Sequence, residues 1–529
     1  MCISVQQLSY IHPDKEELFQ DISFSITKGQ KVALIGDNGS GKSTLMHILK
    51  GDLFPVSGKV IRTSHPYYIP QHFGQYNRVT VAQALRMDDK LRALHAILNG
   101  DASARNFSIL DDDWDIEERS RIALSLWGLD YIDFSTSLDS LSGGEITKLF
   151  LAGIGIHEPG LILFDEPTNH LDYHYRDKLY DFISSSRKTM LIISHDRMLL
   201  NMLPEIYELR KDGIAYYAGN YEFYKMQKEQ EMNSLQAKLE EQEKELRRAR
   251  KIAQEVAERN QKRDARNKKD IQQKGIARII VNTLRNKAEN STAKQKDAHE
   301  QKMGSLRENI GDIRKSLPDM KSMKTDFSTS ALHAGKILIT AKDVNFGYGA
   351  DLLWKNPLNF QIKSGERVLL RGSNGSGKTT LLQLLTRQLP PQAGILTTAD
   401  FSYVYLDQEY SIINNDHSVY EQIRQFSTGL QEHEIKTILN RFLFSYSSWD
   451  KKCGLLSGGE KMKLALSCLM VSANTPDVFI LDEPTNNIDI RNVEILTSTI
   501  RDYKGTILLV SHDQYFIGQM NIDYEIELQ

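Results

Sequence analysis

One short stretch occurs twice in this chain and constrains its fold more than any other feature. GDNGSGKST occupies positions 36–44, and GSNGSGKTT occupies positions 372–380. Each copy follows a short apolar run (KVALIG, RVLLRG) and precedes a helical pattern (TLMHILKG, TLLQLLTR). A glycine-rich loop between a strand and a helix is the context that the phosphate-loop motif G-x-x-x-x-G-K-[ST] requires. The chain is therefore predicted to contain two phosphate-loop domains.

Further motifs repeat in the same order after each loop. They are LSGGE at 141–145 and 456–460, a DEPTN segment at 163–172 and 481–489, and SHD at 194–196 and 511–513. The apolar runs LILFDE, MLIISHD, VFILDE and TILLVSHD resemble short buried strands that end in polar residues, which favours a mostly parallel sheet flanked by helices. The repeat unit of about 200 residues indicates a duplicated domain and not a solenoid.

Composition excludes several classes of protein. The 529 residues suffice for two or three domains, and 40% hydrophobic content supports real cores. The cysteines, Cys2, Cys453 and Cys468, are odd in number and lack metal spacing, which argues against a disulfide framework or a zinc site. No apolar run reaches the roughly 18 residues of a membrane span, and no signal peptide is evident. We therefore expect a soluble, cytoplasmic protein.

A different kind of segment separates the two copies. Pro204 and Pro318 bracket a stretch without proline, with Gly275 near its centre. Apolar residues spaced by three or four on either side predict two long helices that pack as an antiparallel hairpin. These residues are Leu235, Leu239, Leu246, Ala249, Ala253 and Val256, then Met303, Leu306, Ile310, Ile313, Leu317 and Met320. The expected domains are a first cassette at 1–221, a linker hairpin at 222–330 and a second cassette at 331–529.

The linker concentrates positive charge. Residues 222–330 hold 26 Lys and Arg against 18 Asp and Glu, a net of +8 in a chain whose total is −3. The plain interpretation is a solvated coiled coil, but the charges of such a coil would be roughly balanced along its length. The tip at 268–290 carries Lys268, Lys269, Lys274, Arg278, Arg285 and Lys287 among apolar residues such as Ile279.

The phosphate loops predict nucleotide binding. Their glycines let backbone N–H groups face the phosphates, Lys42 and Lys378 add a charge at the β- and γ-phosphates, and Ser43 and Thr379 can ligate Mg²⁺. The predicted ATP-binding residues here are Gly36, Asn38, Gly39, Gly41, Lys42, Ser43, Thr44, Gly372, Asn374, Gly375, Gly377, Lys378, Thr379 and Thr380.

The strand ends predict hydrolysis. Asp165 and Asp482 suit the Mg²⁺ shell, and the adjacent Glu166 and Glu483 are placed to polarise an attacking water. His195 and His512, each after an apolar strand, are expected near the γ-phosphate. LSGGE has no evident catalyst, but its serine and glycines expose N–H groups at a helix start, which makes an anion site. That site comprises Ser142, Gly143 and Gly144 in one copy and Ser457, Gly458 and Gly459 in the other.

Together these motifs resemble the ATP-binding cassette superfamily, in which two cassettes enclose two ATP molecules head to tail. The resemblance implies that Lys42, Asp165, Glu166 and His195 face Ser457 and Gly459, and that Lys378, Asp482, Glu483 and His512 face Ser142 and Gly144. It also implies that Gln71 and Gln408 form the Q-loops and join the metal site, and that Asp172 and Asp489 form the D-loops. Tyr348 would stack on adenine, a role for which Tyr10 and His12 compete in the first copy.

Two cassettes, no membrane span and a long helical linker resemble the ABC-F group in particular. That resemblance implies an α/β fold with two cassettes, intramolecular cassette pairing in a monomer, and a ribosome partner. The linker would enter the tRNA exit site and approach the peptidyl-site tRNA. Its candidate RNA contacts, which would neutralise rRNA and tRNA phosphates, are Lys268, Lys269, Lys274, Arg278, Arg285 and Lys287. Apolar tip residues such as Ile279 would either pack against bases or brace the turn. The Q-loop-to-LSGGE interval is 70 positions in the first copy and 48 in the second. The surplus makes the region 85–110 the candidate for the arm insertion of this group.

Alternatives remain at this stage. A transporter ATPase leaves the linker unexplained, and a DNA-maintenance ATPase would insert its coil inside one cassette. A scaffold whose coil binds proteins is a third alternative. Within the ribosome interpretation, the long basic and apolar tip favours antibiotic protection over a housekeeping factor that relieves stalling. ATP binding is expected to close the cassettes and orient the linker, and hydrolysis to release the protein.

Overall fold

The computed structural model describes most of the chain. The described residues are 2–12, 17–71, 73–74, 78–274, 297, 299–314, 332–349, 351–427, 429–442, 444–472, 475–486 and 488–528. Within 260–274, only the side chains of Lys262 and Arg266 are described. The chain forms two compact units, one of Met1–Glu222 with Met323–Gln529 and one of Phe223–Ser322.

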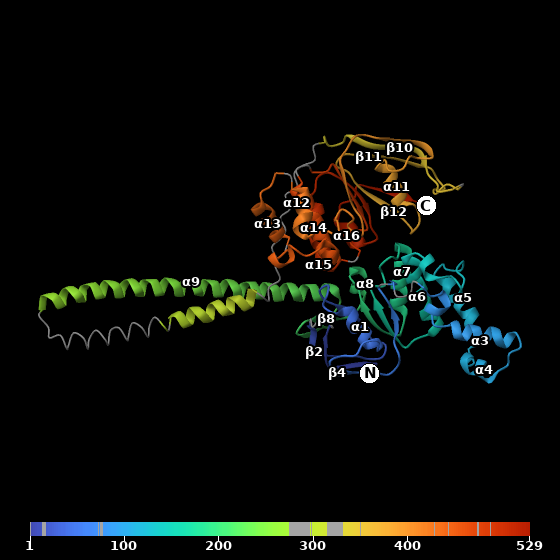
Figure 1. Ribbon diagram of the computed structural model, residues 1–529, viewed down its shortest axis with the longest axis horizontal. Helices are drawn as coiled ribbons and strands as arrows, with labels where there is room; N and C mark the ends of the chain where they lie inside the picture. The colour runs from blue at the N-terminus through green and yellow to red at the C-terminus, as the bar shows by residue number, and fades with distance from the viewer. Residues whose placement is uncertain are drawn as a thin grey trace. The chain divides into compact units, whose positions relative to one another are not determined.

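The first cassette is built on two sheets (Figure 1). A six-stranded sheet has the order β5-β6-β7-β3-β8-β9 and is parallel except for the last pair. Its strands are β3 (Lys31–Ile35), β5 (Tyr67–Ile69), β6 (Leu161–Asp165), β7 (Thr189–Ile193), β8 (Glu205–Arg210) and β9 (Gly213–Tyr217). The antiparallel sheet β2-β1-β4 consists of β1 (Ile3–Ile11), β2 (Glu17–Ile26) and β4 (Ser57–Arg62).

The second cassette repeats this design. Its parallel five-stranded sheet has the order β14-β15-β16-β12-β17, and its antiparallel sheet has the order β11-β10-β13. The strands are β10 (Ile337–Asn345), β11 (Leu358–Lys363), β12 (Arg367–Gly372), β13 (Ala393–Thr398), β14 (Tyr403–Leu406), β15 (Val478–Asp482), β16 (Thr506–Val510) and β17 (Tyr524–Leu528). The parallel sheets confirm the predicted α/β class. Their strands are continuous apolar runs, which need helices on both faces of the sheet to cover them.

Helices follow the strands in both cassettes. The first has α1 (Lys42–Lys50), α2 (Val81–Ala84), α3 (Asp88–Leu98), α4 (Ala104–Leu110), α5 (Ile116–Leu126), α6 (Gly143–His157), α7 (Tyr173–Ser185) and α8 (Arg197–Met202). The second has α11 (Lys378–Leu385), α12 (Val419–Phe426), α13 (Glu432–Arg441), α14 (Gly458–Val471), α15 (Ile490–Arg501) and α16 (Gln514–Gln519). The predicted arm region, 85–110, contains α3 and α4 and stays a prediction as an arm.

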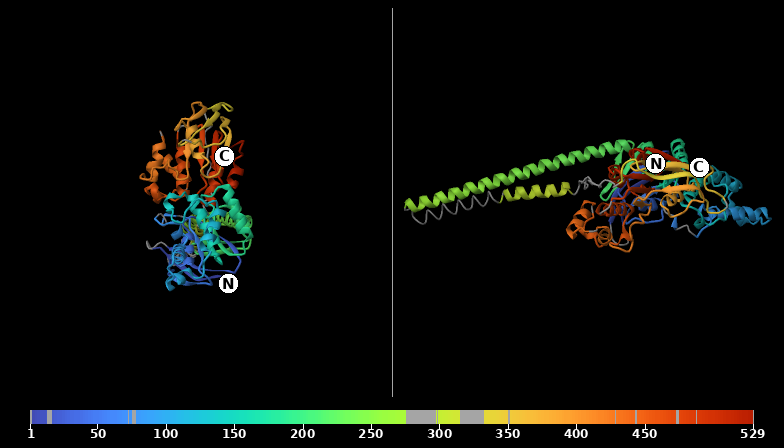
Figure 2. Two further views of the ribbon diagram at one scale, coloured as in Figure 1. Left: turned by 90° about the vertical axis from the view of Figure 1, so that its right-hand side faces the viewer. Right: turned by 90° about the horizontal axis from the view of Figure 1, so that it is seen from above.

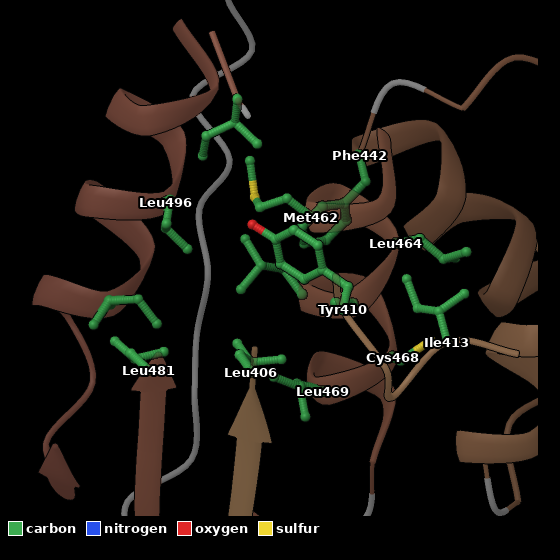
Figure 3. Packing of buried hydrophobic residues seen from close by; sticks show 14 of the residues in the cluster. Leu406, Tyr410, Ile413, Phe442, Met462, Leu464, Cys468, Leu469, Leu481 and Leu496 are labelled. Carbon is green, nitrogen blue, oxygen red and sulfur yellow. The ribbon is translucent and has the colours of Figure 1, made fainter. Parts of the chain in front are cut away.

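Close packing around α14 holds the helical part of the second cassette together (Figure 3). Leu464 is fully buried on α14, among side chains from the strands and from the helices next to it. Tyr410 is only 2% exposed, and its hydroxyl donates to the carbonyl of Pro484 at 3.0 Å, just after β15. This core therefore ties the segment after Gln408 to the end of β15.

The second unit is built on α9 (Tyr221–Lys274), whose 54 residues span roughly 80 Å at about 1.5 Å each. A second helical stretch, 299–314, runs beside it (Figure 2). Arg314 donates to Glu243 at 2.6 Å, and Arg307 lines the same groove as Arg250. Lower residue numbers in one helix thus lie beside higher numbers in the other, so the two helices run antiparallel. Ala249, Leu306 and Ile310 are buried in the seam, in agreement with the predicted hairpin. None of the described helices is long and apolar enough to cross a membrane.

The core around α14 generates a stability prediction. Leu464→Ala removes a fully buried side chain and is expected to lower the free energy of unfolding by about 2–5 kcal/mol. Urea denaturation followed by tryptophan fluorescence measures this loss, because Trp449 belongs to the same cluster. The matched control is Leu455→Ala, where the side chain is 71% exposed. Equal losses in the two variants would contradict this description of the core.

Candidate nucleotide sites

Each phosphate loop joins a strand to a helix and curls over its own lysine. Gly41 caps α1 with φ of 92°, in the left-handed region that glycine favours. Lys42 Nζ donates to the carbonyls of Gly36 at 2.8 Å and Asp37 at 3.1 Å. A side chain at Gly36 would place its Cβ 2.7 Å from the carbonyl oxygen of Leu209, so the close approach requires glycine.

The second loop repeats this geometry. Gly377 caps α11 with φ of 86°, and Lys378 Nζ donates to the carbonyls of Gly372 and Ser373, both at 2.9 Å. Burial lowers the pKa of Lys42 and of Lys378, and the neighbouring carboxyl groups oppose that shift. Each lysine therefore lies among loop carbonyls and carboxyl groups. A bound phosphate could replace the carbonyls as the hydrogen-bond acceptor of the lysine.

Two tyrosines that the motifs did not indicate hold the strand-end aspartates. Tyr68 donates its hydroxyl to Asp165 Oδ2 at 3.1 Å, and Tyr405 donates to Asp482 Oδ2 at 2.6 Å. Each aspartate also accepts a bond from the hydroxyl after the loop lysine, Ser43 in the first copy and Thr379 in the second. The sequence signal for the tyrosines is their position three residues before Gln71 and Gln408 in both copies.

The adjacent glutamates have a strained backbone. Glu166 and Glu483 have φ of 52° and 50°, a conformation that costs a non-glycine residue about 1–3 kcal/mol. Each glutamate N–H donates to the last residue of the neighbouring strand. Glu166 Oε2 in turn accepts from the N–H of His195 at 3.1 Å, and Glu483 Oε2 accepts from that of His512 at 3.3 Å. The predicted catalytic glutamate and histidine of each copy therefore lie in contact.

Burial controls the charge of these groups. Burial, with a contribution from Asp165, raises the pKa of Glu166 to about 8, and burial raises the pKa of Glu483 to about 7. Burial also lowers the pKa of His195 and of His512 to about 3. His195 Nε2 lies 3.5 Å from Glu166 Oε1, but with a neutral ring this contact is not an ion pair at pH 7. Burial favours the neutral form of each of these groups, because a buried charge is costly.

Several buried oxygens in these sites fit a cation. In the described part of the chain, Asp165 Oδ1, Glu166 Oε1 and Glu483 Oε1 are buried without a hydrogen-bond partner. Buried carboxylates of this kind are normally paired or coordinate a metal. Among the described residues, no group of three or more His, Cys, Asp and Glu could hold a metal by itself. A single carboxylate with hydroxyl ligands matches Mg²⁺, which keeps waters and substrate phosphates as its other ligands.

Two cavities collect many of the predicted residues, although Lys378, Thr379 and Asp482 do not line the second. The first has a volume of about 350 Å³ and the second about 550 Å³, and residues of both cassettes line each of them. The first is lined by Asn38, Gly39, Gly41, Lys42, Ser43, Thr44, Gln71, Asp165, Glu166 and His195, with Thr485, Asn486, Ile488, Val493 and Asp513 from the second cassette. The second is lined by Asn374, Gly375, Gln408, Glu483 and His512, with Ser142, Gly144, His170 and Arg176 from the first cassette.

The two LSGGE segments are placed differently. Ser142 caps α6 in a capping box with Glu145, and Ser457 caps α14 in the same way with Glu460. Asn374 of the second loop donates to the carbonyl of His170 at 2.7 Å, beside Gly144. Ser457 and Gly459, although both are described, do not line the first cavity. Their predicted position opposite Lys42 therefore stays a prediction.

The remaining predicted residues divide into three groups. His12 lines the first cavity, whereas its competitor Tyr10 is buried in β1. Tyr348 is 73% exposed, and its hydroxyl lies 3.0 Å from Thr380 Oγ1, so its adenine contact stays a prediction. Of the RNA candidates, Lys268, Lys269 and Lys274 belong to α9 without described side chains, and Arg278, Arg285 and Lys287 lie outside the described residues.

The raised pKa of Glu166 predicts a pH dependence of stability. The folded protein holds this proton from the ordinary pKa of 4.5 up to about 8, so the stability present at low pH is lost as pH rises through about 8. Glu166→Gln removes the titration. In nucleotide-free protein with EDTA, the thermal midpoint of the variant minus that of the parent should grow from pH 5 to pH 8. The exposed control Glu118→Gln should give a constant difference, and a constant difference for Glu166→Gln would contradict the prediction.

Comparison with known proteins agrees with the geometry. The sequence model of the ABC transporter family matches residues 19–169 and 355–486. ATP-binding protein YdiF of Bacillus subtilis is 30% identical over 98% of this chain and 79% of its own length. ABC transporter F family member 5 of Arabidopsis thaliana is 29% identical over 95% of this chain and 72% of its own. Ribosome protection protein VmlR of Bacillus subtilis is 28% identical over 97% and 84%, respectively.

A solved structure supports the fold alone. The archaeal ribosome recycling factor aABCE1, in complex with ribosomal stalk protein aP1, aligns with a TM-score of 0.57 and 18% identity over 98% of this chain and 87% of its own. The family match covers both phosphate loops and both strand-end carboxylate pairs, and the relatives align along nearly the entire chain. With paired nucleotide sites in one chain, this protein belongs to the ABC-F family of tandem ATP-binding cassette ATPases.

Proposed function

We propose that this ATPase is a cytoplasmic ribosome-binding translation factor that protects the ribosome from antibiotics. The observation that carries the proposal is that both cassettes line each nucleotide cavity, which makes nucleotide binding and cassette closure a single event. VmlR, a relative at 28% identity, is named for ribosome protection and supports the choice. The long helical hairpin supplies the element that such a factor would insert toward the peptidyl-site tRNA.

The start of α9 offers a route from the cassettes to the hairpin. Tyr221, the first residue of α9, is only 4% exposed, and the Arg197 guanidinium lies 5.8 Å from its ring centroid. Arg197 also pairs with Glu494 of α15 at 2.9 Å and stacks on Tyr515 at 3.9 Å. A change in cassette pairing at Arg197 would therefore act on the residue from which the hairpin begins.

The hairpin carries a surface suited to a polyanion. In the second unit, one groove is lined by Arg247, Arg250, Arg307 and Arg314, with Glu243 as a counter-charge. Guanidinium groups bind phosphate oxygens in a bidentate manner, and recognition of this kind reads the RNA backbone rather than a base code. This groove supports RNA contact along the paired helices of the hairpin. The six tip cations remain additional candidates for RNA contact.

In the proposed reaction, each half of the chain positions the nucleotide and the water. Lys42 and Lys378 hold the β- and γ-phosphates, and Glu166 and Glu483 accept a proton from the attacking water. A carboxyl pKa near 7 or 8 suits a base at neutral pH. Mg²⁺ would be held by Asp165 with Ser43 and Gln71, and by Asp482 with Thr379 and Gln408. When bound, it would neutralise the developing charge on the phosphates.

Removing the two bases tests the proposed cycle. The variant Glu166→Gln with Glu483→Gln should bind ATP without hydrolysing it and should sediment with ribosomes in the presence of ATP, because the closed cassettes cannot reopen. The matched control is Glu118→Gln with Glu527→Gln, two exposed glutamates outside both cavities. RNase should release the trapped protein, which separates ribosome binding from a protein scaffold. A double variant that stays free of ribosomes with ATP would refute the cycle.

A susceptibility assay distinguishes protection from a housekeeping role. Expression in a sensitive strain should raise the inhibitory concentration of at least one class among lincosamides, pleuromutilins, streptogramins A, macrolides and phenicols. The double glutamine variant should give no such increase, since protection requires turnover on the ribosome. Unchanged inhibitory concentrations for all five classes would favour the housekeeping alternative.

A further inference from the structure

One buried arginine contacts both nucleotide sites. Arg176, in the first turn of α7, is 8% exposed and lines the first and the second cavity. Its Nε donates to the carbonyl of Leu171 at 2.9 Å, and Nη1 lies 3.9 Å from Asp196 Oδ2. The same Nη1 donates to the carbonyl of His512, in the second cassette, at 3.2 Å. Both cassettes belong to one compact unit, and the hydrogen bond from Arg176 to His512 joins them.

The bond to His512 reaches the proposed base of the second site. The N–H of His512 donates to Glu483 Oε2 at 3.3 Å, and its carbonyl accepts from Arg176. One residue of this loop is therefore held on both sides, by the base of its own cassette and by a guanidinium from the other. Hydrogen bonds from a charged donor are among the stronger ones in proteins. Without Arg176, the loop would lose the partner that the first cassette supplies.

In the described part of the second cassette, the position that matches Arg176 does not carry a guanidinium. Alignment of the repeats on Asp172 and Asp489 places Val493 at the position of Arg176. Val493 is 5% exposed and lines the first cavity, but its side chain has no hydrogen-bond donor. The N–H of His195 still donates to Glu166 at 3.1 Å, so the contact within the cassette is preserved. The duplication has thus kept the base and the histidine and changed the residue that reaches across.

We propose that Arg176 is a positioning residue that acts from the first cassette on His512 and Glu483, and that the two sites are consequently unequal. Hydrolysis at the second site depends on the approach of the first cassette through Arg176. Hydrolysis at the first site does not use a guanidinium from the second cassette at the matching position. The inference rests on the proposed roles of Glu166 and Glu483 and does not involve the ribosome.

The experiment measures ATP hydrolysis by purified full-length protein, without ribosomes, in two backgrounds. Glu166→Gln leaves the second site active, and Glu483→Gln leaves the first. Arg176→Met, which keeps the apolar stem, should lower kcat about tenfold in the Glu166→Gln background and less than about twofold in the other. KM for ATP should change by less than about twofold in both. Arg176→Lys, which keeps a charge and a donor, should restore part of the lost kcat.

Controls separate positioning from a general loss of structure. Arg187→Met, which changes an exposed arginine outside both cavities, should leave kcat unchanged in both backgrounds. Equal losses of kcat in the two backgrounds would overturn the inference, and so would no loss in either. If the Met variant does not fold, Arg176→Lys replaces it, and an unchanged ratio of the two kcat values would then overturn the inference. If neither glutamine substitution alone lowers hydrolysis, the assignment of the bases fails first, and this is visible before Arg176 is changed.

Discussion

Burial of carboxyl groups at the ends of β6 and β15 is the constraint on which the rest of the structure depends. Asp165 is 1% exposed and Glu166 is 6% exposed, and a buried charge is unfavourable unless a partner compensates it. Within the protein, the lysine of the phosphate loop and a tyrosine hydroxyl provide only part of that compensation. A site that is incomplete in this way favours a cation and an anionic ligand bound together. The left-handed backbone of Glu166 and Glu483 adds strain that only a firmly held sheet can support.

The cassettes share motifs but differ in how they complete one another. The second cavity contains the LSGGE serine and a glycine of the first cassette, whereas the first cavity contains residues that follow β15 and Asp513. Arg176 and Arg197 of the first cassette correspond to Val493 and Gln514 in the second. Both arginines reach the opposite cassette, so the cationic side chains at these positions belong to one half alone. The two sites of this duplicated ATPase therefore have similar catalytic residues. They differ in the side chains that contact each site from the opposite cassette.

The hairpin unit follows a simpler physical rule. Apolar residues every three or four positions form a narrow seam, and the remaining surface is charged. Ala249, Leu306 and Ile310 are buried, and a small side chain such as that of Ala249 lets helices approach closely. Such a pair is long and presents most of its residues to solvent. It can therefore carry arginines on its surface at little cost to its stability, which suits the proposed contact with RNA.

The sequence by itself determined the duplicated α/β architecture, the two phosphate loops, the strand-end carboxylates and the seam of the hairpin. These features are local, because the residues that determine a strand–loop–helix motif or a seam with 3–4 spacing are close together in the sequence. The tertiary structure alone decided which side chains from distant segments meet. Tyr68 and Tyr405 looked like ordinary strand residues until the sheet placed them against Asp165 and Asp482. Arg176 and His512 are 336 positions apart, and only the pairing of the cassettes brings a guanidinium to that carbonyl, since no local pattern encodes a contact across two domains.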